Sequence, residues 1–127
     1  MRRRDTPPPG EYKMVLVLRG ELRLTAGKAA VQAAHAAVML ADESGRGRSL
    51  DVLHAWKAQG ARKIAVVAPT LDDMRALERE ARAKGLPTVW VEDAGYTEVA
   101  PGTATCLGIG PGRATDVDAV TGDLDLL

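Results

Sequence analysis

Residues 93–105 hold the side chains best suited to chemistry, because a carboxylate, several hydroxyl groups and two glycines lie between two apolar runs. Asp93 follows the apolar run at residues 88–91, and open α/β sheets often hold ligands where a strand ends. A carboxylate there can orient or deprotonate a water molecule. The alternative for Asp93 is an Asx-type turn bonded to the following backbone. Thr97 and Thr105 could hold water, a sugar or a carbonyl group, or could serve only as good strand formers.

A second polar group lies upstream, where Lys28, Gln32 and His35 follow one another at helical spacing. Lys28 falls near the third position of this helix, where the helix dipole disfavours a cation by roughly 0.3–1 kcal/mol. A lysine beside the free N–H groups of a helix start could bind a phosphate or the oxyanion of a tetrahedral intermediate. Lys28 could equally extend into solvent, and His35, which lies among alanines, could be a packing residue. The two polar groups together suggest hydrolysis of an acyl ester on RNA.

We expect neither a metal nor a cofactor. The chain has two histidines, His35 and His54, and one cysteine, Cys106, and none of them has carboxylate partners at the spacing of metal ligands. The sequence also has no P-loop, no nucleophile elbow and no Cys–His pair, so covalent catalysis has no candidate. Cys106 lies in an apolar neighbourhood and is expected in the core, which fits a reducing, cytoplasmic setting.

The charges are unevenly placed along the chain although the net charge is zero. Residues 1–63 carry 12 Lys and Arg against 6 Asp and Glu, whereas residues 64–127 carry 5 against 11. Phosphate contacts are therefore possible if basic residues of the first half share a face, and scattered solvated charges are the alternative. The basic residues considered are Arg19, Arg23, Lys28, Arg46, Arg48, Arg62 and Lys63.

The length of 127 residues and a hydrophobic content of 46% predict one domain with its own core. Residues 1–12 combine three arginines with three consecutive prolines, and we predict a disordered tail there, followed by a domain at residues 13–127. The longest apolar run, Met14 to Leu18, is far shorter than the ~20 residues of a membrane span.

Hydrophobic patterns and capping residues predict the element order β-α-α-β-α-β-β-α. This order indicates an α/β domain with a four-stranded mixed sheet flanked by helices on both faces. Thr25 and Thr70 are expected to cap the first and third helices. The predicted elements are strands at 14–18, 64–68, 88–91 and 103–109, and helices at 26–42, from 50 to near 60, from 71 to near 85, and from 111 onward.

With both polar groups in view, the chain resembles the archaeal and eukaryotic type of peptidyl-tRNA hydrolase, the Pth2 family, over nearly all of residues 13–127. Several short segments carry this resemblance, and their spacing in the chain is also that of the family. They are Lys13-Met14-Val15-Leu16-Val17, Gly27-Lys28 with Gln32 and His35, Gly85-Leu86-Pro87-Thr88, Asp93-Ala94-Gly95 with Thr97, Ala100-Pro101-Gly102-Thr103, Gly108-Ile109-Gly110-Pro111 and Val120-Thr121-Gly122.

The resemblance implies a cytoplasmic enzyme that cleaves the ester between a peptide and the terminal ribose of tRNA, without a cofactor. Lys28, Asp93, Thr97 and Thr105 match the positions that the family associates with activity. The resemblance also implies the mixed sheet predicted above and a homodimer. The resemblance does not assign the general base, because a solvated aspartate with a pKa of ~3.9 is a weak base at neutral pH.

Substrate contacts are expected from Gln32 and His35 on one wall of the site and from Arg23. The family commonly has a basic residue and a glutamine around the threonine that corresponds to Thr97, whereas this chain has Tyr96 and Glu98. Tyr96 could stack on an unpaired base near the tRNA end. A non-catalytic RNA-binding or interaction module on the same scaffold is the alternative function.

Overall fold

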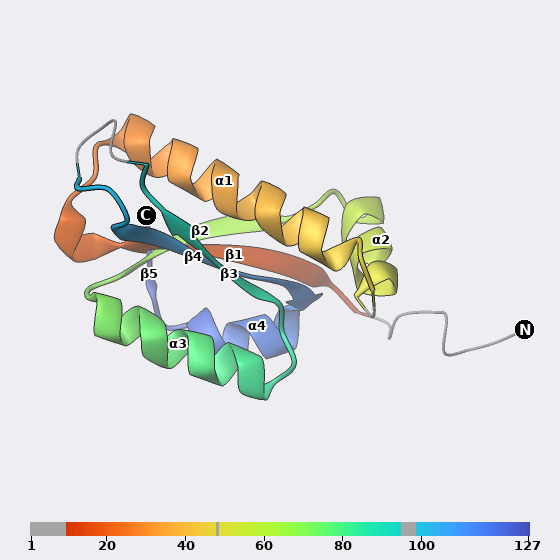
Figure 1. Cartoon of the computed structure of the whole chain (residues 1–127). Helices are drawn as coiled ribbons and strands as arrows, with labels where there is room; N and C mark the ends of the chain where they lie inside the picture. Colours follow the sequence, from red (N-terminus) through yellow and green to blue (C-terminus); the bar gives the residue numbers. More distant parts are fainter. Residues whose placement is uncertain (1–9, 48, 95–98) are drawn as a thin grey trace, which may run out of the picture.

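The computed structural model of the chain describes residues 10–47, 49–94 and 99–127, and the other residues lie outside this description. Figure 1 shows one sheet with α1 and α2 on one face and α3 and α4 on the other, which confirms the predicted α/β class. In chain order the elements are β1 (Tyr12–Arg19), the 3-10 helix η2 (Gly20–Leu22), α1 (Ala26–Ser44), α2 (Leu50–Ala58), β2 (Lys63–Ala68), α3 (Leu71–Ala83), β3 (Thr88–Glu92), β4 (Ala104–Arg113), α4 (Ala114–Thr121) and β5 (Asp125–Leu126).

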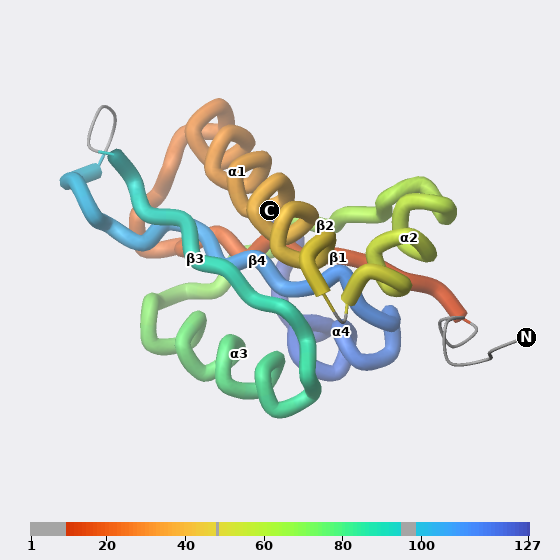
Figure 2. Tube along the Cα trace, turned by 45° about the vertical axis from the view of Figure 1, so that its right-hand side comes forward, coloured from red at the N-terminus to blue at the C-terminus, as the bar shows by residue number. Residues whose placement is uncertain are grey.

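The sheet is mixed, as predicted, with the strand order β3-β4-β1-β2-β5. β1 and β2 are parallel, and the remaining pairs are antiparallel. The fifth strand was not predicted, because its two residues are too few to show a periodic pattern. β4 comes late in the chain but lies between β3 and β1, and Figure 2 shows these three strands side by side under α1.

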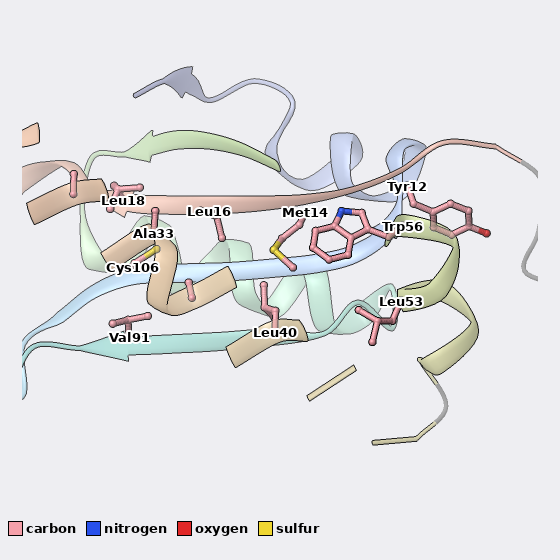
Figure 3. Close-up of a cluster of buried hydrophobic side chains, with 12 residues drawn as sticks. Tyr12, Met14, Leu16, Leu18, Ala33, Leu40, Leu53, Trp56, Val91 and Cys106 are labelled. Atoms are coloured by element: carbon pink, nitrogen blue, oxygen red, sulfur yellow. The ribbon is translucent and has the colours of Figure 1, made fainter. Parts of the chain in front are cut away.

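The core consists of two clusters, one on each face of the sheet. Met14, Leu16 and Leu18 of β1 point toward α1 and α2, as Figure 3 shows, whereas Val15 and Val17 belong to the cluster on the side of α3 and α4. Burial on both faces explains why this strand is apolar throughout instead of alternating. The packing of helices on both sides therefore holds β1 and its neighbours in fixed positions.

The helices α1 and α3 begin at the predicted capping residues, Thr25 and Thr70. The side chain of Thr25 accepts a hydrogen bond from the backbone N of Lys28 at the start of α1, and Thr70 forms a reciprocal capping box with Asp73 at the start of α3. α1 also lies close to β4, because a Cβ atom at Gly108 would stand 2.7 Å from Leu40 Cδ1. These contacts set the position of the helix that carries one half of the predicted site.

Two predicted boundaries are wrong. β1 begins at Tyr12, whose side chain is only 2% exposed, so this residue belongs to the core and not to the tail. The last helix begins at Ala114, and not at Pro111, because β4 continues to Arg113. A register shift in the pairing of β1 with β4, next to Lys13, accommodates the proline, which has no N–H for the ladder.

Candidate active site

The two predicted polar groups meet in a buried ion pair between Lys28 and Asp93. Lys28 is the third residue of α1, Asp93 directly follows β3, and Lys28 Nζ donates a hydrogen bond to Asp93 Oδ1. The side chains are 10% and 2% exposed, respectively, so Asp93 is not the solvated aspartate that we assumed from the sequence. Each charge offsets the other's loss of hydration. The carboxylate also offsets the unfavourable placement of a cation at a helix start.

The backbone of Asp93 is held by the residues at the start of β4. Asp93 N donates to Thr103 O at 2.9 Å, and Gly102 N donates to Asp93 O at 2.9 Å. The φ of +79° at Gly102 is a left-handed turn conformation that glycine adopts without strain. The hydroxyl of Thr103 donates to Ala100 O at 2.7 Å. These bonds fix the position from which the Asp93 carboxylate reaches Lys28, and Thr103 is a supporting residue that we did not predict.

Thr105 and Gln32 form a second polar pair between β4 and α1. Thr105 is fully buried and Gln32 is 3% exposed, and the Thr105 hydroxyl contacts both Gln32 Oε1 and, at 3.2 Å, Val91 O. A hydroxyl has one proton, so both contacts are hydrogen bonds only if the Gln32 amide is turned to donate to Thr105 Oγ1. Gln32 lies one helical turn beyond Lys28, and this buried pair therefore connects α1 to β4 and β3 behind the ion pair.

Of the other predicted site residues, the structure describes His35 and Arg23. His35 is exposed, so the structure does not bring it to the wall occupied by the buried Gln32. Arg23 is exposed beside the start of α1 and has a φ of +50°, a left-handed conformation that is uncommon for arginine. Thr97 and Tyr96 lie outside the described residues, so the structure gives no position for them.

Arg19 makes contacts near the site. The sequence analysis named it only as one of the basic residues that could contact phosphate, and not as a site residue. Its Nη1 donates to Ala104 O at 3.2 Å, and its Nε donates to Glu21 Oε2 at 2.7 Å. The hydrogen bond from Arg19 Nε, together with one from the backbone N of Leu71, lowers the pKa of Glu21. Arg19 thus connects the end of β1 to the first residue of β4, and its place at a strand end was the available signal.

The described part of the chain has no group of three or more His, Cys, Asp or Glu residues that could hold a metal ion. Within the same residues, no helix is both long and apolar enough to cross a membrane. Cys106 is buried as expected, and burial raises the pKa of its thiol to about 12. The site therefore consists of an ion pair, a buried hydroxyl–amide pair and the backbone bonds that hold Asp93.

Comparisons with known proteins agree with the resemblance in the sequence. The family model described as "Peptidyl-tRNA hydrolase PTH2" matches residues 12–127. The chain is 44% identical over 119 residues to a peptidyl-tRNA hydrolase of Methanopyrus kandleri, and this match covers 91% of this chain and 98% of the relative. It is 45% identical over 116 residues to one from Metallosphaera sedula, covering 91% and 99%. A human relative, "Peptidyl-tRNA hydrolase 2, mitochondrial", is 44% identical over 117 residues, covering 92% of this chain and 65% of that protein.

Proposed function

The chain belongs to the peptidyl-tRNA hydrolase PTH2 family, and we propose that Lys28 and Asp93 form the centre at which it hydrolyses the ester bond of peptidyl-tRNA. The buried ion pair between these residues is the observation that supports the proposal. Burying two opposite charges costs a large desolvation free energy, and such buried charged groups are concentrated at functional sites. The pair also combines the two functions that ester hydrolysis requires, a proton acceptor and a cationic donor.

The proposed reaction is direct attack by water. Water oxygen forms a bond to the ester carbonyl carbon, and its proton passes to the Asp93 carboxylate. The carbonyl oxygen becomes an oxyanion, which the Lys28 ammonium stabilises, because an ammonium has three N–H donors and Asp93 Oδ1 engages one of them. The tetrahedral intermediate then expels the ribose oxygen, which takes the proton from Asp93. The products are tRNA with a free ribose hydroxyl and a peptide carboxylic acid, which releases its remaining proton to water at neutral pH.

Thr105 and Gln32 have positioning roles in this proposal. Full burial keeps the Thr105 hydroxyl away from the substrate, and its bond to Gln32 joins β4 to the helix that carries Lys28. A fixed distance between α1 and β3 keeps the ion pair aligned. This role differs from the sequence-based interpretation that the Thr105 hydroxyl could itself hold water, a sugar or a carbonyl group. Thr97 is still proposed to hold the ester.

The remaining predicted residues are proposed to contact RNA. His35 and Arg23 are exposed on the side of the chain that carries α1, so both can reach a bound polyanion. Tyr96 is proposed to stack on an unpaired base.

A homodimer and a cytoplasmic location are part of the proposal. The dimer is supported by an apolar surface on α1, where Val31, Val38 and Met39 are 50%, 62% and 40% exposed. Analytical ultracentrifugation of the native protein and of Val38→Asp tests the dimer: the native protein should sediment as a dimer and the variant as a monomer.

The cytoplasmic location is supported by Cys106, which is buried and forms no disulfide, so the fold requires no oxidising compartment.

The experiment for the site compares hydrolysis of N-acetyl-aminoacyl-tRNA by the native protein with hydrolysis by Asp93→Asn and Lys28→Met. Both variants should lose activity by about 10²-fold or more, because each removes a group that acts in the transition state. Lys57→Met on α2 and Asp51→Asn are matched controls at exposed or partly exposed positions away from the pair, and both should retain native rates. Native rates in folded Asp93→Asn would refute the proposed role of Asp93.

A further inference from the structure

A cavity of about 360 Å³ lies between α3 and the β3–β4 strand pair, on the face of the sheet opposite the ion pair. Its walls include Trp90, Arg75 and Arg79, together with Glu78 and Glu92. The reaction proposed above uses none of these side chains. The combination of one aromatic ring with two arginines is typical of sites that bind unpaired nucleotides.

Trp90 is held in one orientation. Its indole Nε1 donates to Glu78 Oε2 at 2.8 Å, and its ring packs against the core cluster on this side of the sheet. The ring is half-buried, so part of its surface lines the cavity. Trp56, by contrast, is 4% exposed and its Nε1 donates to Arg62 O. Trp90 is thus a rigid, accessible aromatic surface, as base stacking requires.

Arg75 and Arg79 lie one turn apart on α3, and both line the same cavity as the ring. Arginine side chains can stack on a base as well as bond a phosphate. Glu78 and Glu92 offset the two positive charges, so the cavity is not a strong anion site. Stacking, rather than charge, should therefore provide most of the affinity.

The cavity reaches the edge of the sheet at residues that lie next to the candidate active site in the chain. Glu92 precedes Asp93, and Ala104, which also lines the cavity, precedes Thr105. Glu92 and Ala104 are paired across β3 and β4, and β3 is the edge strand. A single-stranded RNA can therefore pass around β3, with its ester end at Asp93 and a preceding nucleotide on the opposite face.

We propose that this cavity binds an unpaired nucleotide of the tRNA acceptor end, with the base stacked on Trp90 and the sugar–phosphate beside Arg79. The proposal rests on the placement of the ester at Lys28 and Asp93. In this proposal the edge strand β3 lies between the two parts of the bound RNA, with the ester on one face of the sheet and the nucleotide stacked on Trp90 on the other. Affinity for the RNA then depends on residues that do not touch the ester.

The first test is tryptophan fluorescence of the native protein titrated with the ribotrinucleotide CCA. Saturable quenching is expected, and Trp90→Leu should abolish it, because the buried Trp56 is shielded from the ligand. An oligomer with the same sugar–phosphate chain but no bases should give no quenching. Equal quenching by the abasic oligomer, or none by CCA in protein that hydrolyses peptidyl-tRNA, would overturn the proposal while leaving Lys28 and Asp93 in place.

The second test separates recognition from chemistry. For N-acetyl-aminoacyl-tRNA, Trp90→Leu should raise KM by about 5-fold to 150-fold, which corresponds to ~1–3 kcal/mol of stacking. The KM for the minimal ester N-acetyl-aminoacyl-adenosine should stay within twofold of the native value. Trp90→Phe retains a ring and should restore much of the tRNA affinity. An equal rise in KM for both substrates would mean that the ring only supports the fold, and the proposal would be rejected.

Arg79→Gln provides a variant that retains the Trp90 ring if Trp90→Leu folds poorly. Its KM for the tRNA ester should rise, whereas Arg82→Gln, a matched change at an exposed position of the same helix outside the cavity lining, should have no effect. Equal behaviour of these two arginine variants would count against a role for the cavity.

Discussion

Removing one partner of the ion pair between Lys28 and Asp93 should destabilise the protein as well as inactivate it. Lys28→Met leaves the Asp93 carboxylate, whose side chain is 2% exposed, without its cation. Loss of one partner of a buried pair costs ~3–5 kcal/mol. For a domain of this size each kcal/mol lowers Tm by roughly 4 °C, so we expect a decrease of roughly 12–20 °C in thermal unfolding.

The reverse change should cost less. Asp93→Asn leaves the lysine unpaired, but the Lys28 side chain is 10% exposed and its flexible stem allows the ammonium group to move toward water. The double variant Lys28→Met/Asp93→Asn removes both charges and should recover at least half of the stability lost in Lys28→Met, although it remains inactive. Calorimetry of the native protein, the two single variants and the double variant measures the order of their Tm values. A Lys28→Met protein that unfolds at the native temperature would refute a buried pair at this position.

Three further outcomes follow from buried groups. Thr105→Val should lower stability by ~1–3 kcal/mol in urea unfolding, because the Gln32 amide is left unsatisfied, and should lower kcat more than it raises KM; no change in either would contradict a positioning role. The thiol of Cys106 should resist Ellman's reagent at pH 8 until the protein unfolds. Burial raises its pKa from 9.0 to about 12, so the unfolded chain releases the proton first and stability should fall as the pH rises from about 9 to about 12; Cys106→Ala should make this decrease smaller, and the raised pKa of Tyr12 should account for part of the remainder. Gly108→Ala should cost ~1–3 kcal/mol in thermal unfolding, since its Cβ would stand 2.7 Å from Leu40 Cδ1, and an unchanged Tm would show that α1 can move away.

The regular elements could be predicted because local chemistry and packing agree. Apolar residues on both faces of β1 and the Thr70–Asp73 capping box at the start of α3 each indicate one structure. Pro111 misled the prediction, because a proline after a glycine normally ends a strand or starts a helix. Pairing with β1 and a register shift keep it within β4, and this long-range constraint leaves no local signal.

The site was predictable in part for a similar reason. Lys28 and Asp93 are unusual in their local positions, a cation at a helix start and a carboxylate at a strand end, and each indicates a partner. Gln32 and His35 differ by only three residues, and helical spacing placed them on one face. One is buried and the other is exposed, because the direction from which β4 approaches α1 decides which of the two is covered. The direction from which β4 approaches α1 could not be predicted from the local sequence of α1.

The central place of β4 has a consequence for how the protein is made. β4 joins β3 to β1, yet it is translated after every element except α4 and β5. A growing chain that has not reached residue 104 has no strand through which β3 can join the sheet, and it lacks Thr105. During synthesis this chain is itself a peptide esterified to tRNA. The topology therefore delays assembly of the candidate site until β4 has been synthesised, so a nascent chain that is still esterified to its tRNA lacks this site before that point.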